Sequence, residues 1–299
     1  MERELVSKNL QGINKALSRI SMIKSCVTIA LVPQLKTGPW IFWENLEQSM
    51  AKAAELGIDA VELFTPAADS VDPEALARLL DHHRLSLAAV GTGAGKVIKG
   101  LTLTDPDPEV RAQAVSFIAD MISFGARFQA PAIIGSMQGN AGGGVEKEQA
   151  LAWLAEGLTQ LGEHAGKEGV TLIYEPLNRY ETNLINQLGE AADFIRALNT
   201  RQVHLLADLF HMNIEETSLP ESIRTNGPLI GHVHFADSNR RPVGFGHTPM
   251  ADIAAALHEI SYAGYISAEA FPWPNPDEAA KQTRKAFDQF FQKEGTVVR

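Results

Sequence analysis

Four side chains able to bind a metal ion occur at the ends of predicted buried strands in the second half of the chain. They are Glu175, Asp208, His234 and Glu269, and successive members are 26 to 35 residues apart. One strand and the helix after it take about 31 residues in a (β/α)8 barrel of roughly 250 residues. Because the parallel strands of such a barrel end at the same face, we expect the four side chains to meet there and form a metal site.

The first of these predicted strands ends in a carboxylate that needs a partner. The apolar run 170–174 has no helical periodicity and follows Gly169, which is typical of a strand buried in a parallel sheet. It leads directly to Glu175, and Pro176 then prevents continuation of a central strand. A charge at the end of a buried strand is unfavourable unless something pairs with it. We therefore expect the Glu175 carboxylate to bind a cation or another partner.

The chemistry of this set follows from its composition. Three carboxylates and one imidazole favour Mn²⁺, Mg²⁺ or Co²⁺ over structural zinc, which prefers thiolates and imidazoles. A divalent ion would offset the negative charge and leave positions open for substrate oxygens. A sugar carbonyl bound there would be polarised, which acidifies the adjacent C–H and stabilises an enediolate, and a carboxylate ligand could act as the base. A single acidic residue at a strand end is more often a helix cap or an ion-pair partner. All four residues in this order and spacing favour a site.

The rest of the chain predicts eight strands alternating with eight helices. The predicted strands are 26–31, 60–64, 85–90, 132–135, 170–174, 203–208, 230–235 and 265–268, and the predicted helices are 42–56, 73–83, 108–124, 146–167, 188–198, 219–224, 250–261 and 276–292. This alternation fits a barrel or a doubly wound sheet. Convergence of the four ligands favours a closed (β/α)8 barrel over residues 22–299, preceded by an appendage at 1–21.

Composition limits the classes of partner. The chain has 299 residues, 45% of them hydrophobic, with no compositional break, so we expect one domain. A net charge of −10 argues against a nucleic-acid partner and favours a small polar substrate. The single cysteine, Cys26, excludes an intramolecular disulfide. No apolar run approaches the roughly 18 to 20 residues that cross a bilayer, and no signal-peptide core is present, so we expect a cytoplasmic protein without a membrane partner.

Two glycine-rich segments have compositions that phosphate-binding loops share. Residues 91–96 read Gly-Thr-Gly-Ala-Gly-Lys, but a P-loop would need glycine at Val90 and a hydroxyl residue at Val97. We therefore expect this segment to form a flexible loop over the site. We interpret the glycine-rich segment 139–144 in the same way.

Several motifs together resemble a known enzyme family. They are Glu-Pro-Leu-Asn-Arg-Tyr-Glu at 175–181, Asp-Leu-Phe-His-Met-Asn-Ile-Glu-Glu at 208–216, His-Val-His at 232–234, Asn-Arg at 239–240, and Glu269. The chain is similar to the ketose 3-epimerases of the D-tagatose/D-psicose type, within the xylose-isomerase-like sugar isomerases and epimerases. The similarity covers most of residues 22–292 and is densest from 170 to 271. The loops of the first half match no specific substrate signature.

This resemblance implies roles for individual residues. Residues matching Glu175, Asp208, His234 and Glu269 bind one metal ion, usually Mn²⁺. Glu175 and Glu269 would lie on opposite sides of the sugar C3, where one removes a proton to give a cis-enediolate and the other returns a proton to the opposite face. Residues matching Glu181, His211 and Arg240 contact substrate. For Glu62, at the end of the second predicted strand, a substrate-binding role and a structural role stay open.

The implied function is inversion at C3 of a ketose or keto sugar acid. An aldose–ketose isomerase or an inosose-type dehydratase on the same barrel and metal site is the alternative. A DNA-repair endonuclease of related fold would need further histidine ligands and a basic face, and a non-catalytic sugar-binding barrel would not need an intact acid/base pair. Barrels of this family commonly pair, so we expect a homo-oligomer, either a dimer or a tetramer.

Overall fold

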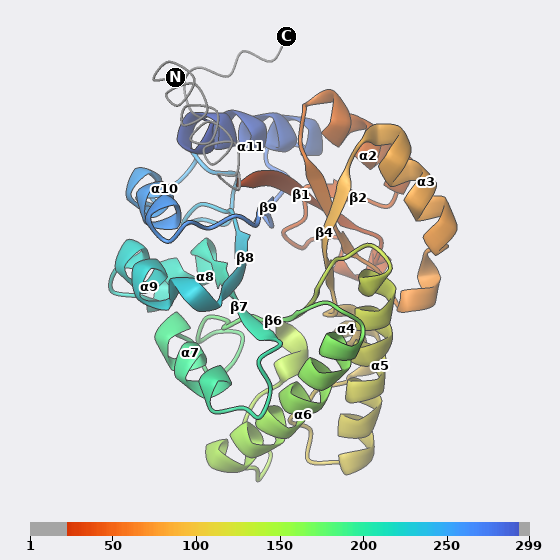
Figure 1. Cartoon of the computed structure of the whole chain (residues 1–299), viewed down its shortest axis with the longest axis vertical. Coiled ribbons are helices and arrows are strands. Elements are labelled where there is room, and N and C mark those ends of the chain that lie inside the picture. The colour runs from red at the N-terminus through yellow and green to blue at the C-terminus, as the bar shows by residue number, and fades with distance from the viewer. Residues whose placement is uncertain (1–22, 293–299) are drawn as a thin grey trace, which may run out of the picture.

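The described part of the protein is a closed parallel barrel surrounded by helices. The computed structural model describes residues 23–292, and the predicted appendage at 1–21 lies outside this range. The barrel strands are β1 Lys24–Ala30, β3 Ala60–Phe64, β4 Ser86–Gly91, β5 Ala132–Ile134, β6 Leu172–Tyr174, β7 Val203–Asp208, β8 Ile230–His234 and β9 Tyr265–Ala268. The helices are α2 Leu46–Glu55, α3 Pro73–His83, α4 Ala94–Lys99, α5 Pro108–Ala126, α6 Lys147–Lys167, α7 Leu188–Arg196, α8 Leu209–Glu215, α9 Leu219–Asn226, α10 Met250–Glu259 and α11 Pro276–Phe291 (Figure 1).

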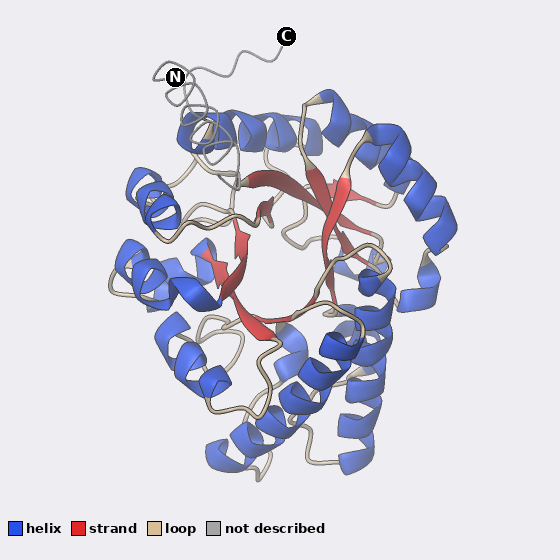
Figure 2. Cartoon of the chain, in the orientation of Figure 1, coloured by secondary structure: helices blue, strands red, loops and turns tan. Residues whose placement is uncertain are grey.

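Pairing between the first and last barrel strands closes the ring. Each strand from β3 to β9 pairs in parallel with the barrel strand before it, and β1 also pairs with β9, where Val27 lies opposite Ala268. The helices lie outside this ring of strands (Figure 2). The predicted (β/α)8 barrel is therefore confirmed. Its geometry directs the carboxyl ends of all eight strands to one face.

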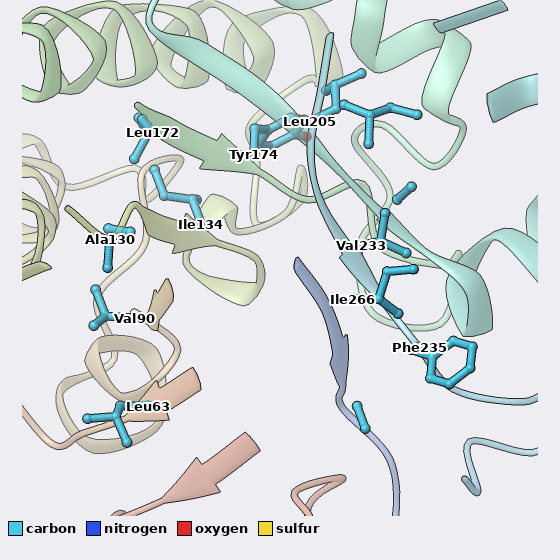
Figure 3. Packing of buried hydrophobic residues seen from close by; sticks show 14 of the residues in the cluster. Leu63, Val90, Ala130, Ile134, Leu172, Tyr174, Leu205, Val233, Phe235 and Ile266 are labelled. Carbon is cyan, nitrogen blue, oxygen red and sulfur yellow. The ribbon is translucent and has the colours of Figure 1, made fainter. Parts of the chain in front are cut away.

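Two separate apolar layers hold the barrel together, because successive side chains of a strand point to opposite sides. Large strand residues such as Leu63 and Leu205 belong to the main core (Figure 3). The same core includes side chains of the surrounding helices, such as Leu76 and Leu154. A smaller cluster of Ala89, Ile133, Ile173 and Leu206, from strands β4 to β7, lies inside the barrel. The outer layer attaches the helices, and the inner layer fills the barrel below the strand ends.

Helix α3 illustrates how local sequence sets an element. The Asp72 side chain accepts a hydrogen bond from the Glu74 backbone N–H at 3.0 Å, and Pro73 occupies the first helical position. The helix ends at His83, before Arg84 adopts a left-handed conformation. Both predicted ends are confirmed.

The predicted helix 42–56 begins too early. Phe42 and Trp43 instead form a short strand, β2 Phe42–Trp43, that pairs in parallel with β1. Glu44 has a φ of 63°, which ends the extended conformation of this strand. Helix α2 then starts after Asn45, whose side-chain oxygen accepts a hydrogen bond from the Gln48 backbone N–H at 3.0 Å. Aromatic residues suit a strand, and the Asn45 cap was the signal for the true helix start.

Two further helices depart from the prediction. The segment 91–96 was expected to be a flexible loop, but helix α4 begins within it, at Ala94. The sequence prediction lacks helix α8, because its N-cap, Asp208, is also a predicted metal ligand. The Asp208 side chain also caps this helix, accepting from the backbone N–H groups of Phe210 and His211.

Candidate metal and sugar site

The four predicted ligands meet at the carboxyl end of the barrel. Asp208 and His234 end strands β7 and β8, while Glu175 and Glu269 directly follow β6 and β9. Each offers a ligand atom that lies within 4.8 Å of the other three, and all four residues are buried. Residues separated by up to 94 positions are thus assembled by closure of the sheet.

One imidazole nitrogen faces all three carboxylates. His234 Nδ1 lies 3.2 Å from Asp208 Oδ2, 3.4 Å from Glu175 Oε1 and 3.6 Å from Glu269 Oε2. Such a concentration of buried acidic oxygens around one nitrogen suits a divalent cation with oxygen and imidazole ligands.

The state of Glu175 tests whether a metal would fit. Its Oε1 atom is buried and has no hydrogen-bond partner, which is unfavourable for a carboxylate oxygen without a cation. Burial, reinforced by the charge of Glu269 and opposed by His234, raises the pKa of Glu175 to about 7. The donor set and this orphaned oxygen together fit a divalent ion.

The two carboxylate oxygens of Asp208 have different roles, one in capping a helix and one at the candidate site. Oδ1 accepts from the backbone N–H of Phe210 at 2.7 Å and of His211 at 3.1 Å, which caps helix α8. Oδ2 is left facing His234. The cap therefore fixes the orientation of the oxygen that would bind the metal.

Glu62 lies behind His234 and outside the cavity wall. Its Oε1 contacts His234 Nε2 at 3.1 Å and its Oε2 contacts His232 Nε2 at 2.8 Å, with all three residues buried. Burial alone would raise the pKa of Glu62, but the two histidines hold it well below its usual range. The contact orients the His234 ring so that Nδ1 faces the carboxylates. Of the two open roles for Glu62, this placement supports the structural one.

His232 was not among the predicted site residues. Its spacing of two from His234 places both side chains on the same face of β8, and this was the available signal. The Glu62 partner comes from β3, across the barrel.

Arg240 connects two acidic residues at the cavity. Its Nη2 donates to Glu269 Oε2 at 2.6 Å, and its Nη1 lies 3.4 Å from Glu181 Oε1. Its guanidinium also lies 4.8 Å from the centre of the Phe210 ring. Charge and an aromatic face thus hold the guanidinium in the cavity that the proposed metal ligands also line.

The loop that carries Arg240 is fixed by one carboxylate. Arg240 has a φ of 58°, and its backbone N–H donates to Asp237 O at 2.8 Å. The Asp237 carboxylate accepts from four backbone N–H groups of the same loop, those of Ser238, Gly244, Gly246 and Thr248. These bonds hold a left-handed residue in place, and they lower the pKa of Asp237 although its partial burial opposes this.

The cavity beside these residues is lined by polar and by apolar side chains. It encloses about 160 Å³. The polar lining residues include Glu175, Glu181, His211, His234, Arg240 and Glu269. The apolar lining residues include Leu35, Pro39, Trp40, Phe64, Val97 and Leu177. The predicted substrate contacts Glu181, His211 and Arg240 therefore share one cavity with three of the proposed metal ligands.

Hydrogen bonds join two loops at the carboxyl end of the barrel, those that follow strands β5 and β6. The Asn183 side chain accepts from Ala141 N–H at 2.8 Å and donates to Ala141 O at 2.9 Å, and Asn140 Oδ1 accepts from Asn183 N–H. Thr182 also donates to Gly139 O. The glycine-rich segment 139–144 is thus attached to the loop that carries Glu181.

Gly135 allows the approach of Glu175. A Cβ atom at position 135 would lie 2.5 Å from Glu175 Oε2, whereas one at Gly189 would come no closer than 4.0 Å to Asn226 Nδ2. We therefore expect Gly135→Ala to displace the carboxylate and to weaken Mn²⁺ binding about 10- to 100-fold in isothermal titration calorimetry. Gly189→Ala is the control and should bind like the unaltered protein. An unchanged Kd for Gly135→Ala would contradict the assignment of Glu175 as a ligand.

Comparison with known proteins defines the family. The model of the family described as "Xylose isomerase-like TIM barrel" matches residues 50–290, and the chain belongs to this family. It is 31% identical over 240 residues to a D-psicose 3-epimerase of Agrobacterium fabrum, covering 79% of this chain and 80% of that protein. It is 30% identical over 238 residues to an L-ribulose 3-epimerase of Mesorhizobium japonicum, covering 78% of each. The predicted family resemblance is confirmed.

A solved structure supports the same grouping. The structure of an L-ribulose 3-epimerase superimposes with a TM-score of 0.77 at 25% identity, covering 91% of this chain and 95% of that one. Among residues 23–292, no helix has the length and apolar character needed to cross a membrane.

Proposed function

We propose that the protein is a metal-dependent isomerase that inverts C3 of a ketose or keto sugar acid through a cis-enediolate. The observation that carries this proposal is that Glu175 and Glu269 reach one small cavity, where each contacts His234 and Arg240 pairs with Glu269. Inversion needs two acid/base groups on two faces of a carbon, and we assign these roles to the two glutamates at this cavity. The named 3-epimerase activities of the relatives support the same reaction.

The ion would be held by the four buried ligands. These are Glu175, Asp208, His234 and Glu269, and we infer Mn²⁺, with Mg²⁺ or Co²⁺ as alternatives, from their oxygen-rich composition. When bound, such an ion polarises a sugar carbonyl and thereby acidifies the neighbouring C–H. Glu62 would keep the His234 ring in the orientation that ligation requires.

The two glutamates would move the proton. One carboxylate takes the proton from C3, and the electrons of the broken C–H bond form the enediolate with the neighbouring carbonyl. The other carboxyl group then gives its proton to the opposite face of C3, and the carbonyl is restored. Glu175 and Glu269 exchange their protonation states in each turnover.

Three further residues would bind the sugar. Arg240 and His211 would donate hydrogen bonds to the oxygens whose negative charge grows as the enediolate forms. Glu181 would accept from a sugar hydroxyl while it pairs with Arg240. The apolar residues that line the cavity would exclude water from this reaction.

Product analysis in D₂O tests the reaction type. Ketoses, keto sugar acids and inososes would be incubated with the Mn²⁺-loaded protein and followed by NMR. We expect inversion at C3 with solvent deuterium at that carbon. An aldose product would support an aldose–ketose isomerase instead, and loss of water would support an inosose-type dehydratase.

We also infer a cytoplasmic homo-oligomer, either a dimer or a tetramer. Its one cysteine, Cys26, is a buried free thiol, which suits a reducing compartment. The exposed aromatic residues Tyr180, Phe271 and Trp273 lie on loops after strands β6 and β9, at the same end of the barrel. We infer that another copy of the chain covers them. Light scattering of the purified protein measures the assembly, and a monomer at micromolar concentration would contradict it.

A further inference from the structure

Asn178 has a side-chain orientation fixed by a backbone donor. Its Oδ1 accepts from the Tyr180 backbone N–H at 2.9 Å, and because an N–H group can only donate, the atom it faces must be the amide oxygen. The amide nitrogen Nδ2 therefore points the other way. It lies 2.7 Å from His211 Nδ1 and 3.2 Å from Glu181 Oε1.

This orientation determines which nitrogen of His211 carries hydrogen. Nδ1 of His211 faces two donors, the Asn178 side chain at 2.7 Å and the Asn178 backbone N–H at 3.3 Å. The carboxylate oxygen Glu181 Oε1 lies 3.9 Å from Nδ1, beyond hydrogen-bond distance. His211 Nδ1 must therefore accept, and the hydrogen of the neutral ring is on Nε2.

The Nε2–H group has no partner within the described protein. His211 is 1% exposed, and its Nε2 atom is buried without a hydrogen bond. Nε2 lies 3.7 Å from Asp208 Oδ2 and 3.8 Å from Glu175 Oε1, and the residue lines the cavity. Buried donors are normally paired, so this group is positioned for a ligand atom that accepts.

We propose that Asn178 is a positioning residue that fixes His211 as an Nε2–H donor toward the substrate. This inference rests on the proposed function and adds to it. The substrate oxygen that faces His211 is an acceptor, either the carbonyl oxygen or the enediolate oxygen derived from it. His211 stabilises that oxygen as a neutral donor and does not remove the proton from carbon.

The tautomer can be measured in the unaltered protein without substrate. The protein would be labelled with ¹⁵N-histidine, loaded with diamagnetic Mg²⁺, and compared with His211→Gln to assign the His211 signals. We expect the ¹⁵N shifts and ring-proton couplings of a neutral ring protonated at Nε2. Signals of a ring protonated at Nδ1 would overturn the inference. Because no turnover is involved, this result is independent of the proposed reaction.

Asn178→Asp separates positioning from structural support. Aspartate keeps the oxygen that accepts from Tyr180 but replaces the donor at His211 Nδ1 by an acceptor. We expect the Nε2–H pattern to be lost and kcat to fall about 100-fold, with a smaller change in KM, as for loss of one donor to a developing oxyanion. An unchanged ¹⁵N pattern in this variant would contradict the role of Asn178.

Asn186→Asp is the matched control in the same loop. Asn186 Nδ2 donates to the backbone oxygens of Leu177 and Thr182, and it makes no hydrogen bond to His211. This variant should keep the His211 tautomer even if its melting temperature falls. If Asn186→Asp changes the His211 signals as much as Asn178→Asp does, loop damage explains both and the inference fails.

Discussion

Replacing Glu269 by glutamine is expected to lower kcat/KM by at least about 1,000-fold, and Glu175→Gln should have an effect of similar size. Both glutamates are proposed to carry the C3 proton and to bind the metal, and glutamine can do neither as well. Steady-state assays with the ketose identified in D₂O measure the loss.

The control and a second measurement separate the two proposed roles. Glu259→Gln alters an exposed residue that pairs with Arg224 at the surface, and it should leave turnover unchanged. Titration with Mn²⁺ shows how much of each loss comes from weaker binding of the ion, because saturating Mn²⁺ can restore only that part. Near-normal turnover in either glutamate variant would reject the scheme of two acid/base groups.

Removal of the metal is expected to abolish turnover, and Mn²⁺ or Co²⁺ should restore it. Buried carboxylates that have lost a cation also destabilise the fold. Mn²⁺ at 100 times its Kd would stabilise the native state by about 2.7 kcal/mol, so dialysis against EDTA should lower Tm by roughly 5 °C. Calorimetry and activity assays before and after addition of Mn²⁺ measure both effects.

A ligand variant provides the control for metal removal. Asp208→Asn loses a carboxylate oxygen that faces His234. The EDTA-treated variant should regain little of the Tm increase when Mn²⁺ is added. Indifference of the unaltered protein to prolonged chelation would argue against the metal assignment.

The positions of the proposed ligands were predictable because each ends a buried strand. A charged residue such as Glu175 after an apolar run needs a partner, and the repeat of strand and helix predicts that such residues converge. The ends of helix α3 were predictable for a similar local reason, since Asp72 and Pro73 define its start. Local sequence carried this information.

Other features depended on contacts that the sequence order does not reveal. The contact between Glu62 and His232 joins residues 170 positions apart and exists only because the barrel closes. The contribution of Asn178 depends on which way its amide is turned, and this is decided by the Tyr180 backbone. Helix α8 was missed for a different reason, because Asp208 serves as a cap as well as a proposed ligand.

The hydrogen bonds that join residues 139–141 to residues 182–183 affect how this enzyme can be redesigned. Reciprocal hydrogen bonds make residues 139–141 and 182–183 one structural module, although they belong to different strand–helix connections. A graft that transplants one connection from a relative would leave the other with unpaired amides. Substrate preference in this barrel should therefore be exchanged by moving both segments together.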